Sequence, residues 1–308
     1  MKRYIRLVVC VLVALMAFES TSAQKGEKAP TTLRFMDWNI ADGMWWDQFK
    51  DYNYFALWMQ AQHIDVFAVC EAATHWDKDK KNIAKEDSLR YLPGKWGELA
   101  KRWGHEYTAI GAYQDNYPVA LTSKDPIEII QQIGGANISH GALHAKVNGI
   151  NIVVLHLWPQ QWHKNDRTRT KGSGGDKFRL EEMNYILDQT IRNPKYANEE
   201  HWIMTGDFNS RSPIDKPFYD VIHKKKPVVF NYDVHNLVRS VYPHDAIAEK
   251  NPDALQSSTR GKNARIDFIY CTKKIFAGIT KAYTIRDDFV RTSSDHCPLV
   301  IEFKKPKK

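Results

Sequence analysis

Cysteine, glycine and proline are scarce in this chain of 308 residues, and no apolar run in it reaches the roughly 20 residues that span a bilayer. Four cysteines are too few for a small disulfide scaffold, and 16 glycines with 13 prolines exclude a collagen-like or low-complexity protein. The mean hydropathy of −0.53 argues against a polytopic membrane protein. The 43% of hydrophobic residues suffices for one large domain or two ordinary ones with a substantial core.

The N-terminal segment is typical of a secretory signal peptide. A basic start precedes an apolar run from Leu7 to Phe18, and small residues then lead to Ala23. The run is too short to span a bilayer, and an uncleaved anchor is the less favoured alternative. We therefore expect a secreted or periplasmic protein with this division: a cleaved signal peptide at 1–23, a flexible lead-in at 24–31, a single domain over 32–304 and a basic tail at 305–308.

Charge and cysteine content narrow the class of partner only slightly. Cleavage removes three basic residues and one acidic residue, so the net charge falls from +8 to +6. This mild bias suits an anionic partner, such as a phosphate ester, nucleic acid or acidic lipid, but requires none.

The mature chain keeps three cysteines, Cys70, Cys271 and Cys297, and each lies in or beside an apolar run. Three is an odd number, so they cannot all form disulfide bonds within the chain. We expect buried free thiols rather than disulfides.

Short apolar strands dominate the rest of the chain. The expected strands are 33–38, 65–70, several within 107–130, 144–147, 150–157, 201–205, 265–271, 281–285 and 298–303. Helical spacing covers about 47–62 and 176–191, and residues 77–90 are charged and expected at the surface. Asn148-Gly149 predicts a tight hairpin turn, because both residues tolerate a positive φ. The pattern predicts a mixed α/β domain of two packed sheets with helices outside.

Polar residues stand repeatedly at the ends of these strands. They are Asn39, Glu71, His156, Asp207, Asn209, Asp267, Asp295 and His296. Such a group at the rim of a buried sheet is costly unless it is paired or used. Each one alone is better explained as a turn residue, a helix cap or a satisfied core side chain. Together they indicate one shared site.

The order Asn, Glu, His, Gly-Asp-x-Asn, Asp, Ser-Asp-His resembles the endonuclease/exonuclease/phosphatase superfamily. Its members include deoxyribonuclease I-like nucleases, abasic-site endonucleases, inositol-polyphosphate 5-phosphatases and neutral sphingomyelinases. The resemblance runs from Leu33 to Phe303, and its most specific segments are 206–209 and 294–296. It implies a four-layer α/β sandwich of two packed mixed β-sheets flanked by helices, with a metal-dependent phosphate-ester site at one end of the sheets.

The resemblance also implies a role for each matching residue. Glu71 would be the main ligand of Mg²⁺, or alternatively Mn²⁺, with Asn39 and Asp295 near the metal. The implied catalytic roles are water activation by Asp207, phosphoryl binding by Asn209, charge stabilisation by His156, and positioning of His296 by Asp267. Mg²⁺ suits these roles because it prefers oxygen ligands and polarises a phosphoryl oxygen. A carboxylate beside His296 favours its imidazolium form, which would face the negative transition state.

Three departures leave the subfamily open. Ala41 stands where many nucleases of the superfamily have an acidic residue, and Asp42 comes one place later. Leu155 replaces the usual polar neighbour of the middle histidine, and the Pro-x-Trp signature of the 5-phosphatases is missing before Asp267.

Substrate specificity is expected from the loops that follow the strands. The candidate substrate-binding residues are Trp45, Trp158, Trp162 and Arg211. The tryptophans would stack on a base or sugar, enter a membrane interface, or simply pack in the core. Segment 161–176 is expected to form a mobile loop over the site. Its basic side chains, Lys164, Arg167, Arg169 and Lys171, either bind phosphate or are solvated.

The sequence thus predicts an exported, metal-dependent, monomeric hydrolase that cleaves a phosphate ester by in-line attack of an activated water. Phosphodiesterase and phosphatase both remain open, as do nucleic acid and a small phosphate ester as substrates. The alternatives are a sphingomyelinase-like enzyme that acts on membrane lipid, and a non-catalytic binding protein on the same fold. A serine hydrolase is disfavoured, because the chain has no Gly-x-Ser-x-Gly motif.

Overall fold

The computed structural model describes residues 31–48, 50–72, 96–115, 117–172, 174–225, 228–251, 259–260 and 264–306. The chain divides into two units, Met1–Thr31 and Thr32–Lys308, and the second contains the fold described below. The predicted signal peptide and lead-in and the charged segment 77–90 lie outside the described residues. Among the described residues, no helix is both long enough and apolar enough to cross a membrane.

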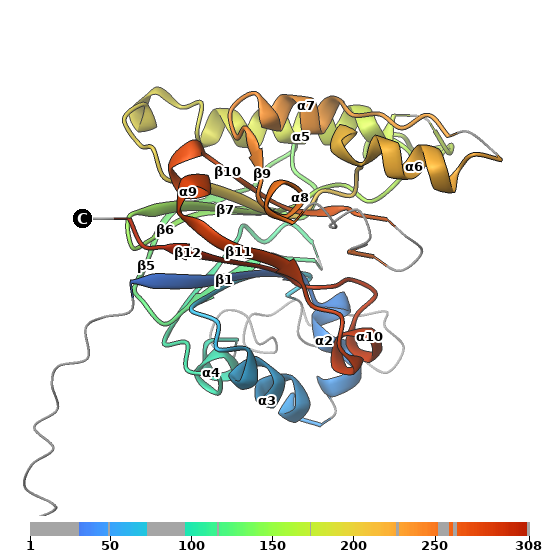
Figure 1. Ribbon diagram of the computed structural model, residues 1–308. Coiled ribbons are helices and arrows are strands. Elements are labelled where there is room, and N and C mark those ends of the chain that lie inside the picture. The colour runs from blue at the N-terminus through green and yellow to red at the C-terminus, as the bar shows by residue number, and fades with distance from the viewer. Residues whose placement is uncertain are drawn as a thin grey trace, which may run out of the picture. The chain divides into compact units, whose positions relative to one another are not determined.

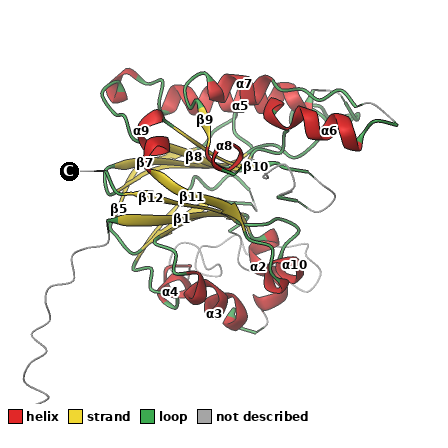
Figure 2. Ribbon diagram, viewed as in Figure 1, coloured by secondary structure: helices red, strands yellow, loops and turns green. Residues whose placement is uncertain are grey.

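Two six-stranded mixed sheets form the centre of the domain (Figures 1 and 2). Across the first sheet the strands are β11 (Ile279–Thr284), β12 (Leu299–Lys304), β1 (Thr32–Asn39), β2 (Val66–Cys70), β4 (Ala120–Ser123) and β3 (Tyr107–Ile110). Across the second they are β5 (Ile127–Ile133), β6 (Ala142–Val147), β7 (Ile150–His156), β8 (Trp202–Asp207), β10 (Asp267–Cys271) and β9 (His244–Asp245). Each sheet has one central parallel pair, β1 with β2 and β7 with β8.

Helices cover the outer face of each sheet (Figure 1). The first sheet is covered by α2 (Ala41–Gln48), α3 (Asn53–Gln62), α4 (Trp96–Lys101) and α10 (Asp288–Ser293), and the second by α5 (Gly175–Gln189), α6 (Lys216–Ile222) and α7 (Asp233–Arg239). Shorter helices join the strands: η3 (Pro194–Tyr196), η4 (Pro213–Asp215), α8 (Ala246–Lys250) and α9 (Lys273–Gly278). The predicted sandwich of two packed mixed sheets flanked by helices is confirmed.

Three apolar clusters separate these layers. In β1, Phe35 lies in the cluster between the sheets, whereas Trp38 lies between the first sheet and its helices. Met204 belongs to the third cluster, between the second sheet and its helices. Because both faces of the central strands are buried, their sequences are continuous apolar runs rather than alternating ones. Each fully buried side chain of this size stabilises the fold by roughly 1.5–3 kcal/mol.

The predicted single helix over about 47–62 is wrong, because the chain forms α2 and α3 there. Asp51 and Tyr52 between them have φ of 53° and 55°. The carboxylate of Asp47 accepts a hydrogen bond from the backbone N–H of Phe55 at 2.8 Å, and its carbonyl accepts from the N–H of Tyr52 at 2.9 Å. These bonds stabilise a tight turn in place of a continuous helix.

Two smaller predictions are confirmed. The hairpin between β6 and β7 turns through Asn148 and Gly149, with φ of 51° and 76°. All three described cysteines are free, Cys70 and Cys271 buried and Cys297 half-buried. Packing rather than disulfide bonding therefore holds the described domain together.

The parallel pairs bring the predicted site residues to one edge of the sandwich. Asn39 and Cys70 end β1 and β2 as register partners, and His156 and Asp207 end β7 and β8 in the same way. Asp267 begins β10 opposite Asp207. The amide of Asn39 donates to the carboxylate of Asp207 at 3.2 Å, which joins the first sheet to the second at this edge.

Candidate active site

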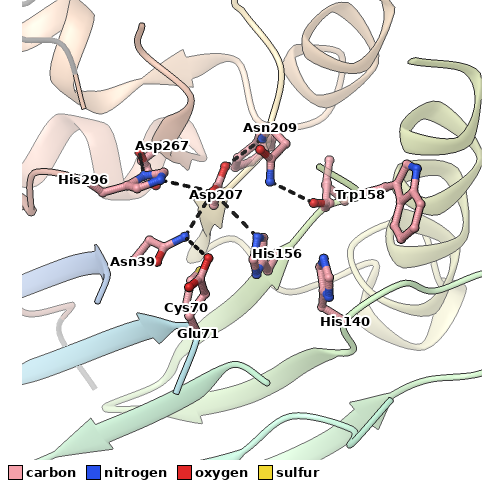
Figure 3. A network of polar contacts seen from close by, with 12 residues as sticks. Asn39, Cys70, Glu71, His140, His156, Trp158, Asp207, Asn209, Asp267 and His296 are labelled. Carbon is pink, nitrogen blue, oxygen red and sulfur yellow. Dashed lines mark hydrogen bonds and ion pairs between the residues drawn. The ribbon is translucent and has the colours of Figure 1, made fainter. Parts of the chain in front are cut away.

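A cavity of about 300 Å³ opens at this edge (Figure 3). Six of the eight predicted catalytic and metal residues line it: Glu71, His156, Asp207, Asn209, Asp295 and His296. The other two, Asn39 and Asp267, are buried and hydrogen bonded to members of this set. The structure therefore brings all eight residues together.

Asn39 links two carboxylates across the cavity floor. Its Nδ2 donates to Glu71 Oε1 at 3.1 Å and to Asp207 Oδ2 at 3.2 Å. The second carboxylate oxygen of Glu71 accepts from the backbone N–H of Asp42 at 2.7 Å. Glu71 has a left-handed φ of 58°, a conformation that costs a non-glycine residue about 1–3 kcal/mol and is typical of functional sites.

Gly206 explains the spacing of the Gly-Asp-x-Asn motif. Its φ is +134°, and a Cβ there would lie 1.8 Å from the carbonyl oxygen of Leu155, so only glycine lets β8 lie this close to β7. Beyond it, Asp207 Oδ1 accepts from the N–H of Asn209 at 2.8 Å, and Asn209 Nδ2 donates to the carbonyl of Leu157 at 3.0 Å. This turn fixes both polar side chains at the cavity.

His296 and Asp267 form a buried pair. Nδ1 of His296 lies 2.8 Å from Oδ2 of Asp267, and its Nε2 lies 3.8 Å from Asp207. Burial disfavours the charged imidazole, but the charge and hydrogen bond of Asp267 outweigh it and raise the pKa of His296 to about 10. His296 is therefore an imidazolium at neutral pH, as expected for an imidazole beside a carboxylate.

His156 has the opposite electrostatics. Its Nε2 lies 3.7 Å from Asp207 Oδ2. Burial lowers its pKa well below the usual value, and the charges of His140 and His296 lower it further. His156 is neutral at pH 7, so its ring can donate a hydrogen bond to a bound group but carries no positive charge.

A fourth buried carboxylate, Asp37, was not predicted. It belongs to β1, is fully buried between the sheets, and its pKa is raised well above the usual value by burial and by the charge of Asp267. The signal in the sequence was an acidic residue inside an apolar strand, a placement that burial makes costly.

The described residues fit a divalent cation bound through oxygen. Asp207, Asp267 and His296 each offer a ligand atom within 4.8 Å of the others. His296 is a poor ligand because metal binding requires a neutral imidazole. The carboxylates of Glu71 and Asp207 suit a hard cation better. Burial raises the pKa of each, that of Asp207 to about 7, and a cation beside them would offset this cost.

The remaining predicted residues lie around the cavity rather than in its floor. Asp295 is 56% exposed at the rim and pairs with Arg260 Nε at 3.3 Å. Arg211 lines a depression of about 490 Å³ that shares Asn209 and Arg260 with the cavity. Its guanidinium lies 4.3 Å from the ring centre of Phe230.

The tryptophans and basic side chains after β7 are not among the residues that line the cavity. The side chain of Trp45 is outside the described part of the structure. The ring N–H of Trp158 donates to the carbonyl of Trp162 at 2.6 Å, and Trp162 forms an isolated antiparallel β-bridge with Gly174. Lys164 donates to the carbonyl of Ile138. The substrate-binding roles of these residues stay predictions.

Sequence reasoning missed a third histidine of the cavity and its partners. His140 and Tyr117 line the cavity, and His140 Nδ1 lies 2.6 Å from Asp115 Oδ2. These residues come from irregular segments beside β4 and β6, where no strand end marks them. In the sequence, the indication is that His140 directly precedes a glycine. The structure shows why a glycine is required there: Gly141 has a positive φ of 85° and lies against the carbonyl of Ala112.

A polar cavity of carboxylates and imidazoles at one end of a two-sheet sandwich defines a hydrolase of the nuclease and phosphatase kind. The chain belongs to the endonuclease/exonuclease/phosphatase family, whose family model matches residues 38–296. This confirms the predicted resemblance. No curated protein sequence matches the chain.

Solved structures show the same fold at low sequence identity. An AP endonuclease from Archaeoglobus fulgidus is 15% identical with a TM-score of 0.58, covering 88% of this chain and 99% of its own. A 3′-5′ exonuclease from Neisseria meningitidis is 14% identical with a TM-score of 0.57, covering 88% and 100%. A family protein from Bacteroides thetaiotaomicron is 14% identical with a TM-score of 0.51, covering 91% and 100%.

Proposed function

We propose that this chain is an exported, Mg²⁺-dependent hydrolase that cleaves a phosphate ester by in-line attack of water. The observation that carries the proposal is the convergence of Glu71, His156, Asp207, Asn209 and His296 on one cavity. Chance does not explain it, because these residues are spread from position 71 to position 296. A binding protein on this fold would not need the whole set, which favours catalysis.

Each side chain has a role that its environment suits. Asp207 accepts a proton from the attacking water, because its carboxylate lines the cavity and lies within 3.8 Å of both His156 and His296. Asn209 and the neutral His156 donate hydrogen bonds to phosphoryl oxygens, and the imidazolium of His296 faces the negative charge that develops there. Asn39 keeps Glu71 and Asp207 in place.

Glu71 would hold the metal ion, with Asp295 at the rim beside it. The ion would polarise the phosphoryl oxygen and stabilise the leaving oxygen. Mg²⁺ fits a site of one or two carboxylates better than a thiophilic metal does, because it prefers oxygen ligands and keeps several waters.

The depression beside the cavity favours an elongated anionic substrate, such as a nucleic acid strand. Arg211 and Arg260 line it, and so does Arg179, whose guanidinium is bonded to the carbonyls of Trp158 and Gln160 and to Asp176. Two structural neighbours are described as an AP endonuclease and a 3′-5′ exonuclease, names that refer to DNA chemistry. Arginine is well suited to bind phosphate groups along a backbone.

A lipid phosphodiesterase is the second candidate, because two apolar side chains are exposed in the segment that ends next to this depression. Val221 on α6 is 72% exposed and Val229 is 97% exposed, and Lys224 and Lys225 lie between them in the chain. Exposed apolar residues beside lysines suit an anionic membrane surface. Val229 lines a second depression, and Arg211 lines both this one and the depression of about 490 Å³ beside the cavity.

Chelation and a substrate panel test the proposal. The protein is recovered from periplasm or medium, where mass spectrometry should find Gln24 as its first residue. With Mg²⁺ it should hydrolyse one of these substrates: single-stranded DNA, duplex DNA, RNA, inositol phosphates or sphingomyelin vesicles. EDTA should abolish turnover, Mg²⁺ should restore it, and a concentration of 100 Kd should stabilise the fold by about 2.7 kcal/mol. Full activity in EDTA would contradict the metal's role.

A further inference from the structure

The cavity contains a second Asp–His pair that the proposed mechanism does not use. His140 Nδ1 lies 2.6 Å from Asp115 Oδ2, and His296 Nδ1 lies 2.8 Å from Asp267 Oδ2. Both histidines line the cavity. In each pair the carboxylate takes the Nδ1 side of the ring and leaves Nε2 for another partner.

The surrounding structure fixes this second pair firmly. Asp115 Oδ1 accepts from the backbone N–H of Tyr117 at 2.9 Å, which orients the carboxylate. Ser139, the residue before His140, is bonded to Glu182 on α5. Its backbone N–H donates to Glu182 Oε1 at 2.6 Å, and its hydroxyl donates to the same oxygen at 2.5 Å. The other oxygen of Glu182 accepts from the N–H of Trp158 at 2.9 Å. A histidine held this closely is suited to a directional task.

The ring of His140 is packed between aromatic neighbours. It stacks on His156 with 4.3 Å between ring centres and an interplanar angle of 29°, and Tyr117 meets it edge-on at 5.4 Å. Its side chain is only 4% exposed, and its Nε2 is buried with no hydrogen-bond partner among the described residues. A buried ring nitrogen without a partner is costly, so a bound substrate or water is its expected partner.

His140 lies on the side of His156 that is away from Asp207. Figure 3 shows Asp207, His156 and His140 in that order across the site. In an in-line displacement the attacking and leaving oxygens lie on opposite sides of phosphorus. If water is activated at Asp207, the leaving oxygen departs toward the His156 and His140 side.

We propose that His140, positioned by Asp115, is the catalytic residue that protonates the leaving oxygen. The inference rests on the proposed function. The bond from phosphorus to the attacking water oxygen forms as the bond to the leaving oxygen breaks. The water proton passes to Asp207, and the proton on His140 Nε2 passes to the leaving oxygen. Exchange with solvent then restores both groups.

The groups that face His140 are consistent with this role. They are Asp115, His156, Tyr117, Trp158 and Glu182. Asp115 binds Nδ1 of the ring at 2.6 Å and leaves Nε2 for a substrate. The adjacent His156 stays neutral, because burial and the charge of His140 lower its pKa.

The test compares leaving groups in the His140→Phe variant, which keeps the stacked ring and removes both nitrogens. Two diesters of thymidine 5′-phosphate are assayed with Mg²⁺, one ethyl and one p-nitrophenyl. p-Nitrophenolate is a stable anion that leaves without a proton, whereas ethoxide needs one. A general acid contributes about 10²- to 10⁴-fold. We expect kcat for the ethyl ester to fall at least 100-fold and kcat for the p-nitrophenyl ester to fall less than about tenfold.

His144→Phe is the matched control. His144 is also buried, stacks on Trp202 at 5.0 Å and bonds through one ring nitrogen to Asn151 at 2.9 Å, but it is not among the residues that line the cavity. It should leave the ratio of the two rates unchanged. Asp115→Asn should give the same leaving-group pattern as His140→Phe with a smaller loss.

The outcomes separate the inference from the proposed function. A wild-type protein that cleaves neither ester and no substrate of the panel overturns the proposed function and the inference with it. If it cleaves another member of the panel, ethyl and p-nitrophenyl esters of that substrate's phosphate group replace the thymidine diesters. Equal losses on both esters, or no loss on the ethyl ester, overturn the inference alone. If His140→Phe is poorly folded by circular dichroism, His140→Ala replaces it, and added imidazole should restore cleavage of the ethyl ester. Failure of imidazole to restore it also overturns the inference.

Discussion

Two clusters of buried carboxylates in this domain differ in what compensates their charge. In the arginine cluster, Arg265 donates two hydrogen bonds to Asp215 at 2.9 Å and one to Asp245 at 2.7 Å. Burial works against the guanidinium charge, but the two carboxylates outweigh it and raise the pKa of Arg265. The chain itself supplies this cation, which makes the cluster structural.

The site cluster, consisting of Asp37, Glu71, Asp207 and Asp267, is held by an amide and an imidazole instead. Asn39 bonds to Glu71 and Asp207, and His296 bonds to Asp267. Burial raises the pKa of Asp37, Glu71 and Asp207. It also raises the pKa of Asp215, but there the charge and hydrogen bonds of Arg265 act in the opposite direction. The comparison shows two arrangements of buried carboxylates: in one cluster an arginine lies between two carboxylates, and in the other a single imidazolium, that of His296, lies among four.

Asp207→Asn gives the largest expected effect and separates the two clusters most clearly. It should lower kcat by about 10²- to 10⁴-fold, because the base is lost. In EDTA it should raise the free energy of unfolding at pH 7, because it removes a buried carboxylate that must take up a proton on folding. Steady-state kinetics and urea denaturation measure the two effects.

Asp215→Asn in the arginine cluster is the matched control for that substitution. It should destabilise the fold and leave kcat of the folded fraction unchanged. Loss of stability in Asp207→Asn, or loss of kcat in Asp215→Asn, would contradict the distinction.

Arg265→Met should lower the free energy of unfolding by about 3–5 kcal/mol, because it leaves two buried carboxylates without their cation. Urea denaturation at pH 7 measures the loss. Combining it with Asp215→Asn and Asp245→Asn should recover part of the stability. The exposed pair of Lys216 and Asp220, 2.6 Å apart, provides the control, and Lys216→Met should leave the free energy of unfolding nearly unchanged. Equal costs at Arg265 and Lys216 would show that burial of the cluster is irrelevant.

Asp37→Asn should have the smallest effect and the opposite sign, so that it raises the free energy of unfolding. The pKa of Asp37 is raised in the folded state, so the folded wild type keeps a proton that the unfolded chain releases above about pH 4. The wild type therefore loses stability relative to the variant as pH rises from about 4 to 8. Urea midpoints in EDTA across this range, with the exposed Asp188→Asn as control, measure the gap. A gap that is constant with pH would refute a protonated Asp37.

The fold and the eight site residues could be predicted because both depend on local patterns. Apolar runs marked the strands, and polar residues such as Glu71 and Asp207 marked their ends. The break between α2 and α3 escaped prediction, because it depends on the Asp47 carboxylate folding back onto the N–H of Phe55. His140 escaped because its role depends on Asp115, 25 residues away, and on a ring from β7. Tertiary contacts of this kind leave little trace in a single sequence.

The amide of Asn39 has a consequence for how heat affects this enzyme. It touches Glu71 beside its own sheet and Asp207 on the opposite sheet, at 3.1 and 3.2 Å. Sliding one sheet over the other by about an ångström would stretch one contact past hydrogen-bonding range. In the proposed mechanism, the apolar layer between the sheets thus sets the alignment of water and phosphorus. Warming should therefore lower the turnover rate before the domain unfolds.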